Sequence, residues 1–282
     1  MADPTLTSEP PLPRLLIIGA PKAGTTTLAA WWDLHPLGFT APDKEVQYFN
    51  VYHERGQAWY RRQFRGMGSA QVGCDASPGY LYVPHALTRI RREIPEARLV
   101  AVLREPATRV WSHWCYFTAL GAEIRPFHEV VADAEVGFSA RGVDYALFSR
   151  YLAPLREVVD RFGRDQLLVL FTDEMRADRQ GVFDRLCDHA GVERAPLPDT
   201  PDRNQGTFPR SARAQRLLQQ ARAGHWPAGI GRRLMAANAS ASGPPAADPE
   251  LLDRLRAIFT PDLGRLQDWL GRPLPATWGA TQ

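Results

Sequence analysis

The chain has 282 residues, of which 44% are hydrophobic and 23% charged, which is typical of a globular protein and excludes a disordered, collagen-like or disulfide-stapled one. A formal net charge of +3 suits small anionic ligands and nucleic acid alike, so charge alone does not decide between them. Cys74, Cys115 and Cys187 lack the spacing of a zinc site or a disulfide framework, so we expect a reducing compartment and no metal.

Residues 1–13 are polar and rich in proline, and we expect them to form a flexible arm ahead of a single domain over residues 14–282. The arm has neither the basic start nor the apolar centre of a signal peptide. No apolar stretch in the sequence is long enough to predict a membrane span. These features favour a cytoplasmic protein that does not associate with membranes.

Short apolar runs predict buried strands at 15–18, 72–75, 99–103 and 167–171. Helical patterns alternate with them at 25–34, 85–94, 107–120, 144–162 and 173–190. Strands that are apolar on both faces and alternate with helices are typical of parallel sheets. We therefore predict an α/β fold of three layers, P-loop-like, with a central parallel sheet flanked by helices.

The C-terminal third has weaker signals. We predict an irregular segment at 199–210, a helix at 212–223 and a flexible surface loop at 238–248. Two short helices should close the chain, at 249–259 and 261–270. Thr260 is placed to cap the second of these helices, and Pro261 stands at its first position.

A loop of small residues follows the first strand and leads into a helix, in the order Gly19, Ala20, Pro21, Lys22, Ala23, Gly24, Thr25, Thr26 and Thr27. Small residues let the backbone approach an anion, and the helix start supplies free N–H groups and hydroxyls. The loop differs from Walker A, because Thr25 stands where that motif has its Lys. The strand 99–103 also ends in Arg104 rather than in a magnesium-binding Asp, which disfavours a metal-dependent NTPase.

The stretch from Pro21 to Thr26 closely resembles the 5′-phosphosulfate loop of sulfotransferases that use 3′-phosphoadenosine-5′-phosphosulfate (PAPS). The resemblance implies that residues 21–27 wrap the 5′-phosphate and that Lys22 contacts the oxygen bridging phosphorus and sulfur. Only two lysines occur among 34 basic residues, Lys22 and Lys44, and both lie in motif-like stretches. A lysine is a compact point charge where the planar fork of arginine does not fit.

The segment from Arg104 to Ser112 resembles the family's 3′-phosphate motif, an arginine at a strand end and a serine eight residues later. Carboxyl ends of parallel strands are where open α/β sheets bind ligands, and both side chains can form charge-assisted hydrogen bonds to phosphate. The alternative is a surface ion pair of Arg104 with Glu105 or Asp75.

The segment Lys44 to Asn50 resembles the K-E-x-x-[FY]-F stretch of the glycosaminoglycan-type sulfotransferases, whose Glu is the catalytic base. The resemblance implies that Glu45 takes the proton of the attacking acceptor. His53 and His113 are lesser candidates, and a solvated Glu45 beside Lys44 is the simpler alternative.

Two further segments resemble the family more weakly. Residues 75–80 resemble an E-K-[ST]-P-x-Y segment of the heparan enzymes, although Ala76 replaces its Lys. Residues 203–210 loosely resemble a K-G-R-x-Y-P stretch over the donor, which makes Arg203, Gly206 and Arg210 candidate donor contacts.

The resemblance implies a soluble bacterial enzyme that moves a sulfuryl group from PAPS to a hydroxyl or amine of a small-molecule or glycan acceptor, without metal, and releases PAP. The alternatives are a P-loop small-molecule kinase, another nucleotide-dependent phosphotransferase, or a non-enzymatic binding module. The arginines are scattered, which disfavours nucleic acid. The sequence identifies neither the acceptor nor the oligomeric state, and five tryptophans are either core residues or a platform for the acceptor: Trp31, Trp32, Trp59, Trp111 and Trp114.

Overall fold

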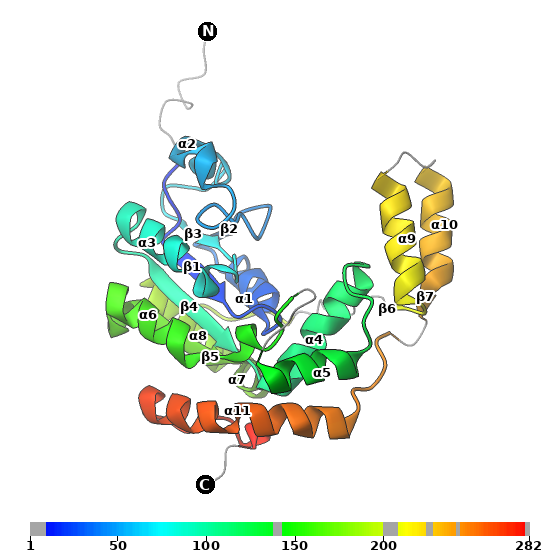
Figure 1. Ribbon diagram of the computed structural model, residues 1–282. Coiled ribbons are helices and arrows are strands. Elements are labelled where there is room, and N and C mark those ends of the chain that lie inside the picture. The colour runs from blue at the N-terminus through cyan, green and yellow to red at the C-terminus, as the bar shows by residue number, and fades with distance from the viewer. Residues whose placement is uncertain (1–9, 138–142, 200–207, 224–227, 241–242, 280–282) are drawn as a thin grey trace. The chain divides into compact units, whose positions relative to one another are not determined.

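The computed structural model describes residues 10–137, 143–199, 208–223, 228–240 and 243–279. The chain divides into two compact units (Figure 1), and each is described by itself below. Unit 1 comprises Met1–Arg104 and Tyr151–Thr200, and unit 2 comprises Glu105–Arg150 and Pro201–Gln282. A single domain over 14–282 stays a prediction, and most of the expected N-terminal arm lies outside the described residues.

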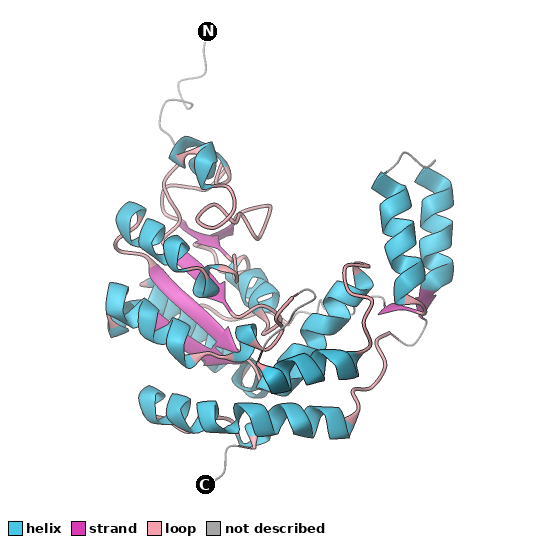
Figure 2. Cartoon of the chain, in the orientation of Figure 1, coloured by secondary structure: helices cyan, strands magenta, loops and turns pink. Residues whose placement is uncertain are grey.

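Unit 1 contains a five-stranded, wholly parallel sheet (Figure 2). In spatial order its strands are β2 (Gly38–Thr40), β3 (Val72–Asp75), β1 (Leu15–Gly19), β4 (Arg98–Leu103) and β5 (Leu167–Phe171). Every residue of β1 is buried, and β4 is exposed only at Arg98, as continuous apolar runs predict. The central parallel sheet is confirmed. Strand β2 was not predicted, because a strand of three residues is too short to show an alternation of apolar and polar side chains.

Helices cover both faces of this sheet (Figure 1). On one face α3 (Pro84–Glu93) contacts α6 (Leu152–Phe162). On the other lie α1 (Thr25–Trp32) and α8 (Arg179–Ala190), where His35 stacks on Trp32 and meets Phe183. The three layers are therefore confirmed. Two short helices complete unit 1, α2 (Gln57–Arg62) and α7 (Thr172–Ala177).

Two long helices predicted from the sequence are interrupted. The helix expected at 144–162 begins only at Leu152, and Leu147–Ser149 forms a single 3-10 turn in unit 2. There Ser149 accepts a hydrogen bond from the buried Arg109 side chain (2.6 Å), which holds the turn against α4. The helix expected at 173–190 is divided into α7 and α8 at Asp178, whose carboxylate caps the second by accepting from Gly181 N–H (2.8 Å).

Unit 2 is mainly helical, with α4 (Pro106–Ala119), α5 (Phe127–Val136), α9 (Ala212–Ala223), α10 (Ala228–Asn238) and α11 (Pro249–Leu270). The last helix packs on α4 and α5, and α9 and α10 form a hairpin. The strands β6 (Phe208–Pro209) and β7 (Ala239–Ser240) pair antiparallel, so part of the expected surface loop at 238–248 is a strand. Of the other 3-10 turns, Ala276–Trp278 belongs to unit 2, and three belong to unit 1, at His53–Arg55, Tyr80–Tyr82 and Arg164–Gln166.

The prediction of two closing helices is wrong, because α11 runs without a break through Pro261. Thr260 does not cap a second helix; its hydroxyl donates to the carbonyl of Arg256 (2.9 Å), one turn back in the same helix. One face of the helix buries a continuous apolar row, namely Leu255, Phe259, Leu263, Leu266 and Leu270. Burial of that row outweighs the hydrogen bond that proline cannot form.

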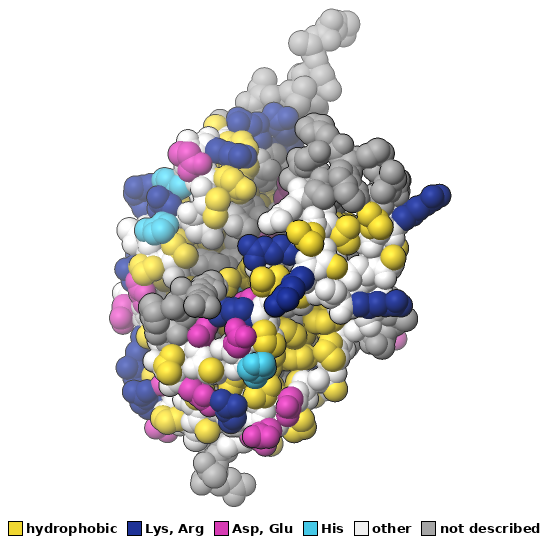
Figure 3. Space-filling view, turned by 45° about the vertical axis from the view of Figure 1, so that its right-hand side comes forward, with side chains coloured by type: hydrophobic (Ala, Val, Ile, Leu, Met, Phe, Trp, Pro, Cys, Tyr) yellow, Lys and Arg dark blue, Asp and Glu magenta, His cyan; other side chains and the backbone are white. Residues whose placement is uncertain are grey.

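None of the helices that the structure describes is both long and apolar enough to cross a bilayer. On the face shown in Figure 3, Lys and Arg side chains are interspersed with acidic and hydrophobic ones rather than gathered into one field. Such a mixed surface is typical of solvated globular proteins.

Candidate functional site

The loop between β1 and α1 turns back sharply in unit 1. Its backbone has a positive φ at Lys22 (67°) and at Gly24 (103°). A positive φ favours glycine, which explains the glycine at position 24. Gly24 is the N-cap of α1, and no side chain caps this helix start, so the threonines do not act as the cap we expected. The N–H groups of the first helical turn therefore have no side-chain acceptor and suit an anion.

Neighbouring strand ends hold the other side of the loop. The Thr172 hydroxyl lies 2.6 Å from the carbonyl oxygen of Ala23 and 3.1 Å from that of Leu103, at the end of β4. Arg104 donates to the carbonyl of Lys22 (3.3 Å). These bonds tie the loop to the carboxyl ends of β4 and β5. Thr172 was not among the residues predicted from the sequence, although a threonine directly after a buried strand is the available signal.

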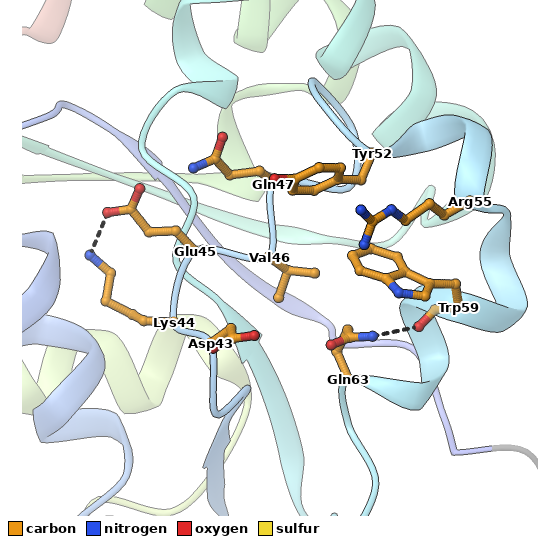
Figure 4. Close-up of a pocket in the computed structure, with 9 residues that line it drawn as sticks. All are labelled: Asp43, Lys44, Glu45, Val46, Gln47, Tyr52, Arg55, Trp59 and Gln63. Carbon is orange, nitrogen blue, oxygen red and sulfur yellow. Dashed lines mark hydrogen bonds and ion pairs between the residues drawn. The ribbon is translucent and has the colours of Figure 1, made fainter. Parts of the chain in front are cut away.

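The segment that contains Glu45 is joined to this loop through Lys44. The ammonium group of Lys44 donates to Thr26 Oγ1 (2.9 Å) in the first turn of α1 and to Glu45 Oε1 (3.0 Å). Figure 4 shows Lys44 and Glu45 facing one another, and the Glu45 side chain is 43% exposed. One lysine thus brings together two motifs that lie about 20 residues apart in sequence.

The turn after β3 holds the backbone of this segment at several points. Ala76 N–H donates to the Lys44 carbonyl (3.1 Å), and Gln47 N–H donates to the Ser77 hydroxyl (2.9 Å). Gln47 itself has a positive φ of 53°. Segment 75–80, which resembles the family only weakly, therefore holds the backbone around Glu45 by hydrogen bonds, and Ala76 takes part through its N–H group.

Asp75 organises that turn from inside the unit. Its carboxylate is fully buried and accepts hydrogen bonds from the hydroxyls of Ser77 (2.6 Å), Tyr80 (2.8 Å) and Tyr60 (2.9 Å). Burial raises the pKa of Asp75 to about 6, although these hydrogen bonds act in the opposite direction. Asp75 is therefore not an ion-pair partner of Arg104. Glu105 is engaged as well, because its carboxylate caps α4.

The two histidines considered as alternative bases have structural partners. His53 lies 2.7 Å from Glu93. Burial acts to raise the pKa of Glu93, but hydrogen bonds from His53, Arg92 and Tyr48 leave it below its usual value. His113 belongs to unit 2, where it is buried and accepts from the Arg109 guanidinium (3.1 Å). Each of the two histidines therefore has a structural partner, and the assignment of the base stays a prediction.

A cavity of about 430 Å³ opens beside Glu45 in unit 1, which is a suitable size for a small ligand. Its lining is polar on one side and aromatic on the other (Figure 4): Asp43, Lys44, Glu45, Val46, Gln47, Tyr52, Arg55, Trp59 and Gln63. Trp59 is the one candidate platform tryptophan in this lining. Trp31 and Trp32 are buried in the core, and Trp111 and Trp114 stack on each other in unit 2 (4.9 Å between ring centroids).

The remaining predicted donor contacts are divided between the units. Arg104 is the last residue of the first stretch of unit 1, whereas Ser112 is half-buried in α4 of unit 2. Arg203 and Gly206 lie outside the described residues, and Arg210 is exposed after β6. Their contacts with a donor stay predictions. Within the described part of the chain, no three His, Cys, Asp or Glu side chains are grouped as metal ligands.

Comparison with known families gives a match to the model described as the sulfotransferase family, over residues 39–196, more than half of the chain. Heparan sulfate glucosamine 3-O-sulfotransferase 3B1 of Mus musculus is 25% identical over 187 residues, 65% of this chain and 47% of that protein. Membrane-associated sulfotransferase kil1 of Dictyostelium discoideum is 33% identical over 107 residues, 36% of this chain and 22% of that protein. The chain thus matches less than half the length of these relatives.

Among solved structures, a sulfotransferase from Alicyclobacillus acidocaldarius has the same fold, with a TM-score of 0.73. It is 23% identical, and the match covers 95% of this chain and 99% of that one. At 23% identity, the similarity to this structure establishes the fold alone. The matched fold spans both units, whereas the family model begins at residue 39, after the loop of residues 19–27.

Proposed function

The chain belongs to the sulfotransferase family, and we propose that it transfers the sulfuryl group of PAPS to a hydroxyl or amine of a small-molecule or glycan acceptor, with PAP as product. One observation carries this proposal: Lys44 donates both to Thr26 on the loop expected to hold the donor and to Glu45. A donor site and a base within one hydrogen-bonded chain are what in-line transfer between two bound substrates requires.

The residues divide the reaction between them. Glu45 accepts the proton of the acceptor as its oxygen or nitrogen attacks sulfur. Lys22 and the N–H groups of Gly24 to Thr27 stabilise the charge that develops on the departing phosphate. Lys44 acts as a positioning residue, because its ammonium group holds the Glu45 carboxylate beside the first turn of α1. No step calls for a metal ion.

Two substitutions separate the donor role from the base role. Lys22→Ala should weaken PAP binding and lower turnover with every acceptor. Glu45→Gln should leave PAP affinity nearly unchanged while the rate of PAP release from PAPS falls by about 10²–10⁴, the usual effect of a positioned base. Calorimetry with PAP, in the presence of chelator, measures the first quantity, and the initial rate with any working acceptor measures the second.

Glu54→Gln is the matched control, since Glu54 is an exposed glutamate of the same unit outside the cavity lining. It should change neither quantity. A Glu45→Gln protein that keeps more than about a tenth of the wild-type rate contradicts the base role of Glu45. Preferential binding of ATP with magnesium over PAP contradicts the proposed reaction and favours a kinase.

A further inference from the structure

Arg55 occupies the aromatic side of the cavity that Glu45 lines. Its guanidinium carbon lies 4.3 Å from the ring centroid of Tyr52 and 4.9 Å from that of Trp59. The two rings meet edge to face, with centroids 5.8 Å apart. Cation–π contacts with two rings favour this position of the exposed guanidinium, on the aromatic side of the cavity.

No acidic side chain of the described residues neutralises this guanidinium. Arg55 forms neither a side-chain hydrogen bond nor a salt bridge there, although Glu54 is its neighbour in sequence and Asp43 and Glu45 line the same cavity. Glu45 is paired with Lys44 instead. Aromatic contacts engage the face of the guanidinium and leave its in-plane N–H groups for another acceptor.

The charges in the cavity are distributed unevenly. Figure 4 shows Asp43, Lys44 and Glu45 together on one side, and Arg55 with Tyr52 and Trp59 on the other. Because Lys44 is paired with Glu45, the net negative charge of the first side is that of Asp43, so an anionic group is disfavoured there and attracted by Arg55. A ligand that carries a hydroxyl and an anionic group would therefore bind in one direction, with the hydroxyl toward Glu45.

We propose that Arg55 determines acceptor specificity by binding a carboxylate of the acceptor, so that the substrates are hydroxylated carboxylic acids. The planar fork of arginine matches a carboxylate with two parallel hydrogen bonds. The inference rests on the proposed function, because it takes the group facing Glu45 to be the one that becomes sulfated. It adds to that function a chemical class of acceptor and a residue that selects it.

Binding of matched acid and amide pairs tests this role. The probes are 4-hydroxyphenylacetate against 4-hydroxyphenylacetamide, and methyl β-D-glucuronoside against its amide, each titrated by NMR with saturating PAP. The first pair represents a phenolic carboxylate and the second a sugar carboxylate. For at least one pair, the acid should bind wild-type protein roughly tenfold or more tightly than the amide, as expected for a charge-assisted contact.

Arg55→Gln should abolish that preference, whereas Arg62→Gln should retain it, because Arg62 is an exposed arginine of α2 outside the cavity lining. Should the glutamine variant not fold, Arg55→Lys keeps the charge without the fork and should reduce the preference severalfold. The inference is overturned if neither acid is preferred by the wild type, if neither acid binds, or if the preference survives in the folded Arg55 variant.

PAP affinity distinguishes this failure from failure of the proposed function. The side-chain contacts found for Arg55 among the described residues are with Tyr52 and Trp59, outside the loop of residues 19–27, so PAP should bind the Arg55 and Arg62 variants as it binds the wild type. Intact PAP binding with no acid preference rejects the role of Arg55 alone. Absent PAP binding in wild-type protein rejects the sulfotransferase reaction itself.

Discussion

Asp75 is a carboxylate without a basic partner, fully buried at the end of β3. Three hydroxyls and the backbone N–H of Val46 donate to it, and its pKa is raised to about 6. A raised pKa means that the folded state binds the proton more tightly than the unfolded chain does. The stability that protonation contributes is therefore present at low pH and is lost as the pH rises toward 6.

Asp75→Asn should remove this pH dependence. Between about pH 4 and pH 7, the free energy of unfolding of wild type should fall by about 2 kcal/mol relative to the variant, because the pKa of Asp75 is 3.8 in the unfolded chain and about 6 in the folded one. Urea unfolding at several pH values measures the difference. Asp43→Asn, at an exposed position, is the control and should show no such trend. A constant difference between wild type and Asp75→Asn would mean that Asp75 does not change its protonation in this range.

At the scale of single residues, the sequence suggested candidate chemical residues but not the contacts that support them, and the roles of the candidates stay predictions. Lys22, Glu45 and Arg104 were selected by motif, and the structure places all three in unit 1. That Lys44 joins Thr26 to Glu45 was not predictable, because the bond spans 18 residues and depends on the fold. Local spacing likewise contains no signal for Tyr60, whose hydroxyl reaches Asp75 from α2.

Among the elements, α11 is the clearest case in which tertiary packing overrides a local signal. Thr260 and Pro261 predict a helix boundary, yet the apolar row from Leu255 to Leu270 keeps one face buried along the whole helix. Asp248 caps its start by accepting from Glu250 N–H (3.0 Å), and Gly271 ends it in a left-handed conformation. The predicted outer bounds, 249 and 270, agree with the helix, and only the predicted internal boundary was wrong.

Pro261→Ala should stabilise unit 2, because alanine restores the N–H that the helix interior lacks and removes the clash of the ring. We expect the free energy of unfolding to rise by roughly 1–3 kcal/mol. Pro249→Ala is the matched control: Pro249 stands in the first turn, where no intrahelical N–H bond is lost, so its effect should stay below about 1 kcal/mol. Thermal or urea unfolding measures both. Destabilisation by Pro261→Ala would show that contacts of the proline ring outweigh the missing bond.

Long apolar strands were the elements predicted best. The runs at 99–103 and 167–171 form β4 and β5, paired in continuous register from Leu99 and Leu167 to Leu103 and Phe171. The short elements β2 and α2 were missed, although α2 supplies Trp59 to the cavity. Segments of three to six residues show too few periods for amphipathicity to be read, so their structure depends on the surrounding fold.

Across the whole molecule, the boundary between the two units falls inside the motif predicted to bind the 3′-phosphate. Arg104 closes the first stretch of unit 1, and Glu105 opens unit 2 with the cap of α4. The loop of residues 19–27, Glu45 and the cavity all belong to unit 1, whereas Ser112 belongs to unit 2. Substitutions of Arg104 and of Ser112, each tested by PAP binding, therefore examine one predicted donor residue from each unit.

PAP should raise the unfolding temperature in the presence of chelator, because a ligand that binds only the folded state stabilises it by about 2.7 kcal/mol at a hundred times its Kd. Adenosine 5′-monophosphate lacks the 3′-phosphate and should protect less at equal concentration. Arg104→Ala should lose roughly 1.5–3 kcal/mol more of PAP affinity than of the monophosphate's, since only PAP offers the charge-assisted contact, whereas the bond from Arg104 to the Lys22 carbonyl is lost for both ligands. Ser112→Ala should have the same selectivity with a smaller loss. Arg98→Ala, at the opposite end of β4, should change neither ligand's effect. An equal rise in the unfolding temperature of the wild type with both nucleotides would mean that the motif from Arg104 to Ser112 does not bind the 3′-phosphate.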